Sequence, residues 1–530
     1  MFYFLPAWYR DDGSWDCKER VWYRASQRNG FDDTINQVRM FHQAGEAVSL
    51  LVPVYFPDLR YFCYQEKIFE VPMMSLFDVL QGIPADLTIQ PLDYHDFDWP
   101  PSAELVYGPF CIYVYDHGQL YACLYHNAEG VLIRMDRLSD QHVFQVLDFD
   151  DRGFLSRAKT LDQDGKVIKS EYFDHLGNRQ FIIQADGTVQ LSEQSHLQLN
   201  RSTYPNLTAL IQDCFAIFAQ EQLKGDDVLV AAAAANHDQL LTRVVPQEKL
   251  VFSYFSDRVD LTNETEQAMT KKAQLVIADS SYNYRRLRAT GAPTVQLPPL
   301  DTRLQLGTSN QERLLKVFML IDRAQAADRK VALRQLMELM EENHLIDLTL
   351  ASYHNQEYVD ELNRLVAEIT AEEDFADEFR FNQEPADDDN NELTGIADSE
   401  IMKGETVTHY IHFEAIDSEP HLIEAIHATR LLIDLGERPD VFLQIAGISA
   451  GIPELLRTAS IYVKDGENGR HLKHLDPELK EATDFYLTGV KNWNQALAQA
   501  AQRIADYTSG KIVTQMKAAL TAARKGKGEG

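Results

Sequence analysis

The stretch Phe442-Leu-Gln-Ile-Ala-Gly-Ile-Ser-Ala-Gly-Ile-Pro453, near the C-terminal end, decides the fold of this chain. Its small residues predict a tight turn at Gly451 and Pro453 that presents backbone amides at the start of a helix, where an anion or a sugar hydroxyl can bind. A second stretch, Tyr462-Val-Lys-Asp-Gly-Glu-Asn-Gly469, follows shortly after it. The Gly-x-x-Gly spacing of this second stretch predicts a turn that closes the same pocket. We therefore expect a binding loop that includes Ser449, Gly451 and Pro453, although the same residues also suit a purely structural turn.

The two stretches together resemble the donor-sugar loop of GT-B glycosyltransferases. Retaining enzymes of that kind carry two glutamates eight residues apart, and the second lies five residues before the glycine of a Gly-x-Pro turn. In this chain the two positions are Arg438 and Ala446, so a cation and a methyl group replace two hydrogen-bond acceptors. Glu437 lies one residue before the first position. If the match to the enzyme pattern is shifted by one residue, the first glutamate is present but the second is still missing. We expect no catalytic residue and no cofactor.

The overall composition predicts an acidic, soluble protein with several domains. The 530 residues include 81 acids and 50 bases, which gives a net charge of −31. Such a charge repels phosphate backbones and anionic lipids, so nucleic acid is excluded as a partner and so is direct membrane insertion. The five cysteines form no Cys-x-x-Cys pair, and no apolar run approaches the roughly 20 residues of a membrane span. We expect a cytoplasmic protein that meets the inner face of the membrane only through protein partners.

Residues 1–55 and 200–305 are predicted to form one Rossmann-like domain that is discontinuous in sequence. Val48-Ser-Leu-Leu-Val-Pro-Val54 is a continuous apolar run, typical of a strand that is buried on both faces of a parallel sheet. Beyond residue 206 a helical pattern alternates with further apolar strands, which also indicates a parallel sheet.

Residues 56–199 are predicted to be an extended antiparallel β-meander inserted into that domain. Glycines recur about every 12 residues, mostly close behind an Asp or Asn, and the arms between them, such as Lys166 to Phe173, alternate polar and apolar residues. Because Gly tolerates positive φ, this pattern indicates successive hairpin turns. The turn glycines are Gly118, Gly130, Gly153, Gly165, Gly177 and Gly187.

Residues 306–522 are predicted to form a second Rossmann-like domain. Its last helix, about residues 492–522, is expected to cross back to the first domain, and residues 523–530 are expected to be disordered. Arg323 lies near the start of this domain, where GT-B enzymes place a basic pair that neutralises a departing diphosphate. Arg323 could reach a phosphate, and a solvated charge at a helix end is the alternative.

Two further groups of side chains invite a functional interpretation. Trp8, Tyr9 and Trp15 follow the first strand, on the side where GT-B folds admit the acceptor; stacking on a sugar is one use and core packing is the other. Four histidines lie between residues 409 and 427 and suggest a metal site. His409 and His412 would point to opposite faces of a strand, so they cannot chelate together, and we expect no metal site.

Motifs at both ends of the chain resemble one known family, the first of the three accessory Sec system proteins of Gram-positive bacteria. The order of the expected domains agrees with that family throughout. The motifs are Phe2-Tyr-Phe-Leu-Pro-Ala-Trp-Tyr9, Arg430-Leu-Leu-Ile-Asp-Leu-Gly436, Pro439-Asp-Val-Phe-Leu-Gln-Ile445, Ile448-Ser-Ala-Gly-Ile-Pro453, and Tyr486-Leu with Lys491-Asn-Trp-Asn494.

This resemblance implies a GT-B-like protein without transferase activity that carries an inserted β-domain. It implies as partners the two sister accessory proteins, the dedicated second SecA motor and a glycosylated serine-rich-repeat adhesin, exported through the second SecY channel. A working glycosyltransferase that modifies the same adhesins is the competing hypothesis, because such enzymes share the fold and the insertion.

Overall fold

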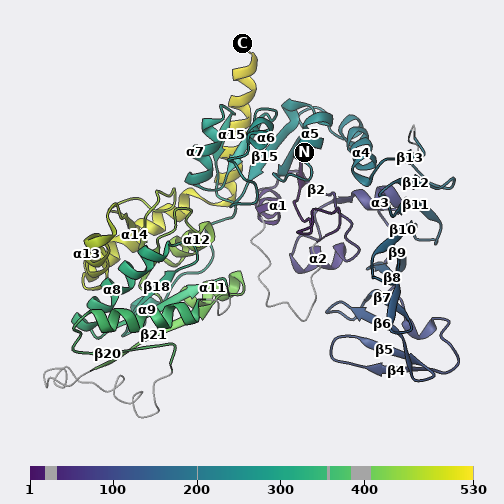
Figure 1. Cartoon of the computed structure of the whole chain (residues 1–530). Coiled ribbons are helices and arrows are strands. Elements are labelled where there is room, and N and C mark those ends of the chain that lie inside the picture. Colours follow the sequence, from purple (N-terminus) through teal and green to yellow (C-terminus); the bar gives the residue numbers. More distant parts are fainter. Residues whose placement is uncertain (18–32, 198, 200, 355–357, 384–406, 529–530) are drawn as a thin grey trace.

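The computed structural model describes residues 1–17, 33–197, 199, 201–354, 358–383 and 407–528. These residues build three sheets, two of them parallel and one antiparallel. Figure 1 shows the two parallel-sheet domains beside each other, with the antiparallel sheet extending from the first domain on the side away from the second.

The first domain is a seven-stranded parallel sheet with the strand order β17-β16-β15-β14-β1-β2-β3. Its central strands are buried along their whole length, as their apolar sequences predict. The strands are β1 (Phe2–Leu5), β2 (Val48–Val52), β3 (Met73–Ser75), β14 (Val228–Ala232), β15 (Leu250–Tyr254), β16 (Leu275–Ala278) and β17 (Thr294–Gln296). The helices are α1 (Asp33–Gln43), α2 (Leu59–Gln65), α3 (Leu76–Gln81), α4 (Leu207–Glu221), α5 (Asp238–Val244), α6 (Glu264–Thr270) and α7 (Ser281–Ala289).

The insertion is a ten-stranded antiparallel meander in which each strand pairs with the next along the chain. All six turn glycines named above have positive φ, as the turn pattern predicts. The strands are β4 (Ala103–Tyr107), β5 (Ile112–Asp116), β6 (Gln119–His126), β7 (Leu132–Ser139), β8 (His142–Asp150), β9 (Phe154–Leu161), β10 (Val167–Phe173), β11 (Arg179–Gln184), β12 (Val189–Leu191) and β13 (Thr203–Tyr204). In Figure 1, β13 lies next to α4 and β4 lies at the far end.

The expected limits of the insertion, 56 and 199, are wrong at both ends. Strand β3 pairs in parallel with β2, so it and the flanking helices α2 and α3 belong to the first domain. At the other end, β13 pairs with β12 and extends the meander to Tyr204. The sequence concealed both limits because β3 and β13 have only three and two residues.

The second domain is a seven-stranded parallel sheet with the strand order β20-β21-β19-β18-β22-β23-β24. Its strands are β18 (Leu315–Leu320), β19 (Ile346–Ser352), β20 (Glu378–Phe381), β21 (Thr408–Ala415), β22 (Leu431–Asp434), β23 (Glu454–Leu456) and β24 (Gly469–His471). Its helices are α8 (Ala326–Glu342), α9 (Val359–Glu372), α11 (Glu419–Ile426), α12 (Val441–Ala450), α13 (Leu475–Leu487) and α14 (Val490–Asp506).

Short 3-10 helices lie in different parts of the chain, at Tyr94–Asp96 before β4, at Gln247–Lys249 before β15 and at Ser309–Gln311 before β18.

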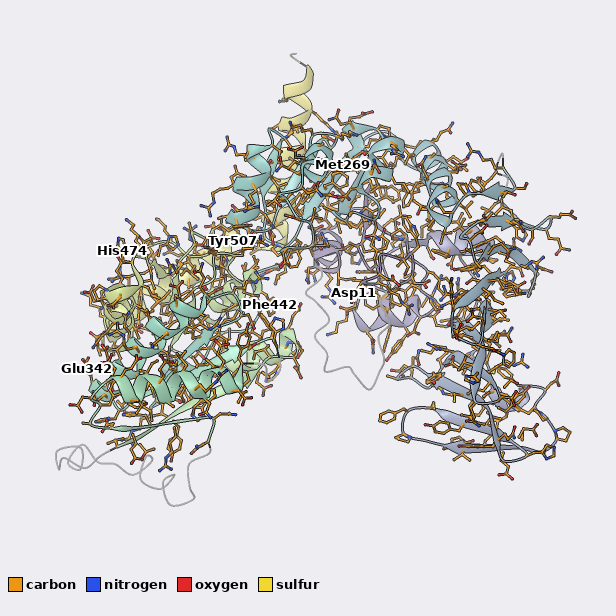
Figure 2. All side chains as sticks on the ribbon, in the orientation of Figure 1. Asp11, Met269, Glu342, Phe442, His474 and Tyr507 are labelled. Atoms are coloured by element: carbon orange, nitrogen blue, oxygen red, sulfur yellow. The ribbon has the colours of Figure 1, made fainter. Side chains whose placement is uncertain are left out.

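Two helices, and not one, end the chain. Helix α14 packs on the second domain, and α15 (Ser509–Gly528) returns to the first domain, where Ile512, Val513 and Met516 join its core. Tyr507 lies between these helices, where the two parallel-sheet domains meet (Figure 2). Its hydroxyl donates to the Ile461 carbonyl at 2.9 Å. Helix α15 continues through residues 523–528, so the expected disordered tail is wrong there, and residues 529–530 lie outside the described part.

No helix among the described residues combines the length and the apolar character needed to cross a bilayer.

Candidate functional site

The stretch that resembles a donor loop is a buried helix, α12. Asp440 caps its N-terminus by accepting a hydrogen bond from the Leu443 amide at 2.8 Å, and every residue from Val441 to Ala450 is buried. Gly451 ends the helix in the left-handed conformation, with φ of +75°. The expectation that Gly451 presents amides at a helix start is therefore wrong, because this glycine closes a C-terminus, where carbonyls are the exposed groups.

Gly451 meets two structural demands. Its positive φ strains any residue with a side chain, and a β-carbon built on it would overlap the Leu497 side chain of α14. Pro453 follows at the entrance to β23, where its carbonyl accepts from the Leu432 amide at 3.1 Å. Both residues thus fix how α12 joins the second sheet.

Ser449 holds the linker between the two parallel-sheet domains. Its hydroxyl oxygen accepts from the amides of Leu304 and Gln305, at 2.8 and 2.9 Å. The same hydroxyl donates to the Gln305 carbonyl at 3.3 Å. All three bonds are made within the chain, so Ser449 positions the linker.

The two positions at which the resemblance expects glutamates contact other parts of the chain. Ala446 packs in the apolar cluster beneath α12. Arg438 places its guanidinium 4.6 Å from the centre of the Tyr282 ring in the first domain. Its carbonyl accepts from Arg323, at 3.2 Å, and the other terminal nitrogen of Arg323 donates to the Ser256 hydroxyl of the first domain, also at 3.2 Å. These contacts of Arg323 and Arg438 with the first domain are called the seam below.

Three carboxyl groups near α12 differ in burial: Asp434 and Glu454 are buried and Glu437 is exposed. Asp434 accepts from the amides of Gly436 and Asp440 at 2.9 and 2.7 Å, and burial raises the pKa of Asp434 to about 6. Burial raises the pKa of Glu454 well above its usual value. Glu437 is exposed and accepts from the Gln325 amide at 3.3 Å. Asp434 holds the backbone at the start of α12, and of these three carboxyl groups only Glu437 is open to solvent.

An open pocket of about 400 Å³ lies against the Gly-x-x-Gly turn. No residue of the Ser449–Pro453 stretch lines this pocket, so it is not the pocket that the turn was expected to close. The polar and aromatic lining residues are Ser460, Lys464, Asp465, His471, Arg503 and Tyr507.

The three aromatic residues proposed to face an acceptor pack inside the first domain. Trp15 is buried and its indole nitrogen donates to the Thr208 hydroxyl at 2.9 Å. The Tyr9 hydroxyl lies 2.7 Å from Nδ1 of His237, whose pKa burial lowers to about 3. Trp8 packs edge-on against Phe62, with ring centres 4.9 Å apart. Core packing, the alternative weighed for these residues, accounts for Trp15, whereas Trp8 and Tyr9 are partly exposed and a role of these two on the acceptor side stays a prediction.

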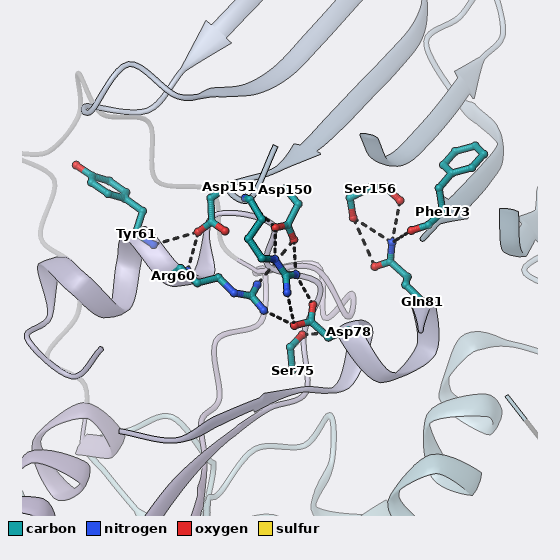
Figure 3. A network of polar contacts seen from close by, with 10 residues as sticks. Arg60, Tyr61, Ser75, Asp78, Gln81, Asp150, Asp151, Ser156 and Phe173 are labelled. Atoms are coloured by element: carbon teal, nitrogen blue, oxygen red, sulfur yellow. Dashed lines mark hydrogen bonds and ion pairs between the residues drawn. The ribbon is translucent and has the colours of Figure 1, made fainter. Parts of the chain in front are cut away.

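A buried ion network, which sequence reasoning missed, joins the insertion to the first domain (Figure 3). Arg152, at the turn between β8 and β9, has a side chain only 3% exposed. It donates to Asp150 at 2.6 Å and to Asp78 of α3 at 2.8 Å, and Asp78 also pairs with Arg60 of α2. The members come from α2, α3 and the β8–β9 turn, and no local sequence motif links these three segments. This set, Arg60, Asp78, Asp150, Asp151 and Arg152, is called the junction.

Asp151 completes the junction. One of its oxygens accepts from the backbone amides of Arg60 and Tyr61, at 2.7 and 3.0 Å, which holds the first turn of α2. Burial, together with the neighbouring Asp150 charge, raises the pKa of Asp151 to about 8. Beside the junction, Gln81 donates to the carbonyls of Ser156 and Phe173 at 2.9 and 2.6 Å.

The far end of the meander is apolar and exposed. Val106 on β4 is 47% exposed and Phe110, in the turn that follows, is 51% exposed. Strand β4 is the last in the strand order, so one of its edges carries no further strand of the described sheet. Such an edge is a surface on which another protein can add a strand.

The fold and these sites together define a class, the GT-B glycosyltransferase-like proteins with an inserted β-domain. The pneumococcal O-GlcNAc transferase GtfA has this fold: its structure matches with a TM-score of 0.64 at 10% identity and covers 98% of both chains. That likeness concerns the fold alone.

The chain belongs to the family of the first accessory Sec system protein, whose model matches residues 1–523. The member of this family from Streptococcus gordonii is 31% identical over 534 residues, and the member from Staphylococcus aureus is 28% identical over 526 residues. Each match covers 97% of this chain, with 97% and 98% of the relatives. The resemblance drawn from the sequence is thus confirmed.

Two solved complexes contain similar chains. One is the structure of accessory secretory proteins 1, 2 and 3 of Streptococcus pneumoniae, with a TM-score of 0.74, 26% identity and coverage of 99% of this chain and 100% of that chain. The other is the Gap123 complex of Streptococcus agalactiae, with a TM-score of 0.72, 27% identity and coverage of 98% and 100%.

Proposed function

We propose that this chain is a non-catalytic member of a cytoplasmic accessory Sec complex that it forms with its two sister accessory proteins. One observation carries the proposal. At the positions where the resemblance expects two donor-binding glutamates, Arg438 contacts the first domain and Ala446 packs in the core. A cation and a methyl group accept no hydrogen bond from a sugar or a ribose, so the fold serves assembly and not glycosyl transfer.

The similar chains in the pneumococcal and Streptococcus agalactiae complexes support the assembly part of the proposal, because the likeness extends over almost the whole chain. Beyond the sister proteins, we expect the complex to meet the second SecA motor and a glycosylated serine-rich-repeat adhesin. The net charge of −31 favours contact with the inner face of the membrane through these partners and not through lipid.

We assign the contact with the sister proteins to the far end of the meander. The junction holds the sheet at the turn between β8 and β9, so β4 and β5 extend beyond it as an arm. This arm presents an apolar tip and an edge that carries no further strand of the described sheet. Exposed apolar side chains beside an open strand edge are typical of a surface that binds another protein.

A co-purification experiment with a matched control tests this assignment. The double variant Val106→Lys and Phe110→Lys places two charges at the tip, and we expect it to fold but to lose the sister proteins on affinity capture. Leu176→Lys is the control, because Leu176 is 74% exposed but lies at the β10–β11 turn of the same sheet. Equal capture by the double variant and the control would refute the role of the tip. Failure of the unaltered chain to capture either sister protein would refute the complex itself.

A further inference from the structure

Three potential metal ligands meet at the edge of the second sheet, and they come from three separate elements. His344 follows the end of α8, Asp377 precedes β20, and His409 lies on β21. Nε2 of His409 lies 3.0 Å from Oδ2 of Asp377, and Nδ1 of His344 lies 3.4 Å from both of these atoms. The three atoms therefore form a nearly equilateral triangle.

The size of this triangle suits a tetrahedral metal ion. Zinc binds imidazole nitrogen and carboxylate oxygen at about 2.0–2.2 Å, so ligand atoms on one face of a tetrahedron lie about 3.3 Å apart. The observed separations of 3.0, 3.4 and 3.4 Å agree with that figure without any movement of the side chains. Two imidazoles and one carboxylate are also a donor set that zinc uses, with a fourth position left for water.

The surroundings hold the ligands in place. The other oxygen of Asp377 accepts from the Val407 amide at 3.0 Å, which leaves Oδ2 facing the two imidazoles. The Phe379 ring stacks on His409, with ring centres 5.1 Å apart. The side chains of His409 and Asp377 are 4% and 8% exposed, whereas that of His344 is 26% exposed and gives access to solvent.

We propose that the His344–Asp377–His409 cluster is a binding site for a divalent transition-metal ion of the zinc type. The ion would tie the edge strand β20 to β21 and to the end of α8, and its fourth position would face solvent. Glu342, two residues before His344, lies at the outer end of the second domain, on the side away from the first domain (Figure 2). The proposal replaces the expectation of no metal site, which considered only the histidines between 409 and 427.

Other histidines of this domain provide an internal comparison. His421 also contacts two carboxylates, but Asp417 lies on its Nδ1 at 3.0 Å and Glu414 on its Nε2 at 3.1 Å. One ion cannot contact opposite nitrogens of one ring, so His421 forms hydrogen bonds and no chelate. His421→Gln is therefore a control that removes an imidazole beside carboxylates without removing a proposed ligand.

The test uses the untagged full chain, freed of metal with a chelator and then titrated with Zn²⁺ in competition with a chromophoric chelator. We expect one ion per chain and, with Co²⁺ instead, the intense visible absorption of four-coordinate cobalt. His344→Gln and Asp377→Asn should each weaken Zn²⁺ binding by at least about 100-fold. Loss of a residue that only hydrogen-bonds to a metal ligand already costs about 10- to 100-fold in affinity, and loss of a ligand itself should cost at least as much. His421→Gln should bind as the unaltered chain does.

The variants can be checked without metal, because melting temperatures in excess chelator report whether each one folds. His344 is partly exposed, so His344→Gln should melt as the unaltered chain does under that condition, whereas added Zn²⁺ should stabilise only chains that keep all three ligands. Absence of stoichiometric Zn²⁺ binding would overturn the proposal, and so would equal Zn²⁺ affinities of His344→Gln, Asp377→Asn and His421→Gln.

Discussion

The first domain has two neighbours, and it is joined to them in opposite ways. At the junction with the inserted sheet, Arg152 is almost fully buried between two aspartates. At the seam with the second domain, Arg323 is exposed and makes two hydrogen bonds of 3.2 Å, while Arg438 lies over the half-buried Tyr282 ring. A buried charge that loses its partner is costly, whereas an exposed one is rehydrated. The comparison indicates that the insertion and first domain move as one body, and that the seam can adjust.

Breaking the junction should have the largest effect. Arg152→Met leaves Asp78 and Asp150 without their shared buried cation, and we expect it to destabilise the folded chain by about 3–5 kcal/mol. Denaturant unfolding measures the loss. Arg179→Met is the control, because Arg179 is 51% exposed and pairs with Glu171 on the same sheet; its effect should stay below about 1 kcal/mol. If Arg152→Met and Arg179→Met lose similar free energies of unfolding, the buried ion pairs of the junction contribute no more to stability than an exposed pair does.

A substitution at the end of α12 should have the next largest effect. Gly451→Val combines an unfavourable positive φ with overlap on Leu497, and we expect a loss of about 2–4 kcal/mol. Gly466→Val separates the two causes, since Gly466 has φ of +76° but open space around it. It should cost only the backbone strain, about 1–3 kcal/mol. If the two variants are equally stable in thermal unfolding, the close approach of α14 contributes nothing.

The junction should also give a pH dependence. Because the pKa of Asp151 is raised to about 8 in the folded chain, this group stays protonated there while it is ionised in the unfolded chain above about pH 4. Its contribution to stability is therefore complete at low pH and is lost as pH rises toward 8. Relative to Asp151→Asn, the unaltered chain should lose on the order of 1 kcal/mol or more between pH 5 and pH 8. If the free energy of unfolding changes by the same amount in both proteins between pH 5 and pH 8, the raised pKa of Asp151 is wrong.

Breaking the seam should have the smallest effect on stability. Arg323→Ala removes two exposed hydrogen bonds, and we expect a change below about 1 kcal/mol. Small-angle scattering should nevertheless show a larger radius of gyration, because the two domains are freer to separate. Arg285→Ala is the control, since Arg285 is exposed on the first domain and bonds within its own helix. An unchanged radius in Arg323→Ala would show that the seam does not hold the domains together.

The parallel sheets were largely predictable from sequence, and one helix beside them was not. Strands such as Val48–Val52 are apolar throughout because both of their faces are covered, and that signal is local. The segment Val441–Ala450 has the same apolar character, but it is a helix buried on all sides and so shows no helical periodicity. Gly447 and Ser449 within it and Gly451 just after it suggest a turn, but burial of the surrounding apolar residues overrides that preference.

The functional clusters could not be read from sequence because they are assembled by the fold. Asp78 and Arg152 meet only after the meander has turned back onto α3, and His344 meets Asp377 and His409 only at the sheet edge. Spacing rules detect ligands on one element, and these residues come from several. The family, in contrast, was recognisable, since its motifs are continuous stretches of sequence.

We expect this chain to assemble with its sister proteins and not to transfer sugar. Incubation of the purified chain, alone and with its sister proteins, with a panel of UDP-sugars, followed by measurement of released UDP, tests it most directly. We expect no release of UDP above a heat-denatured control. If UDP is released above that control and the release disappears in Glu437→Gln, the chain is an enzyme, because the exposed carboxylate beside Arg438 then supports turnover.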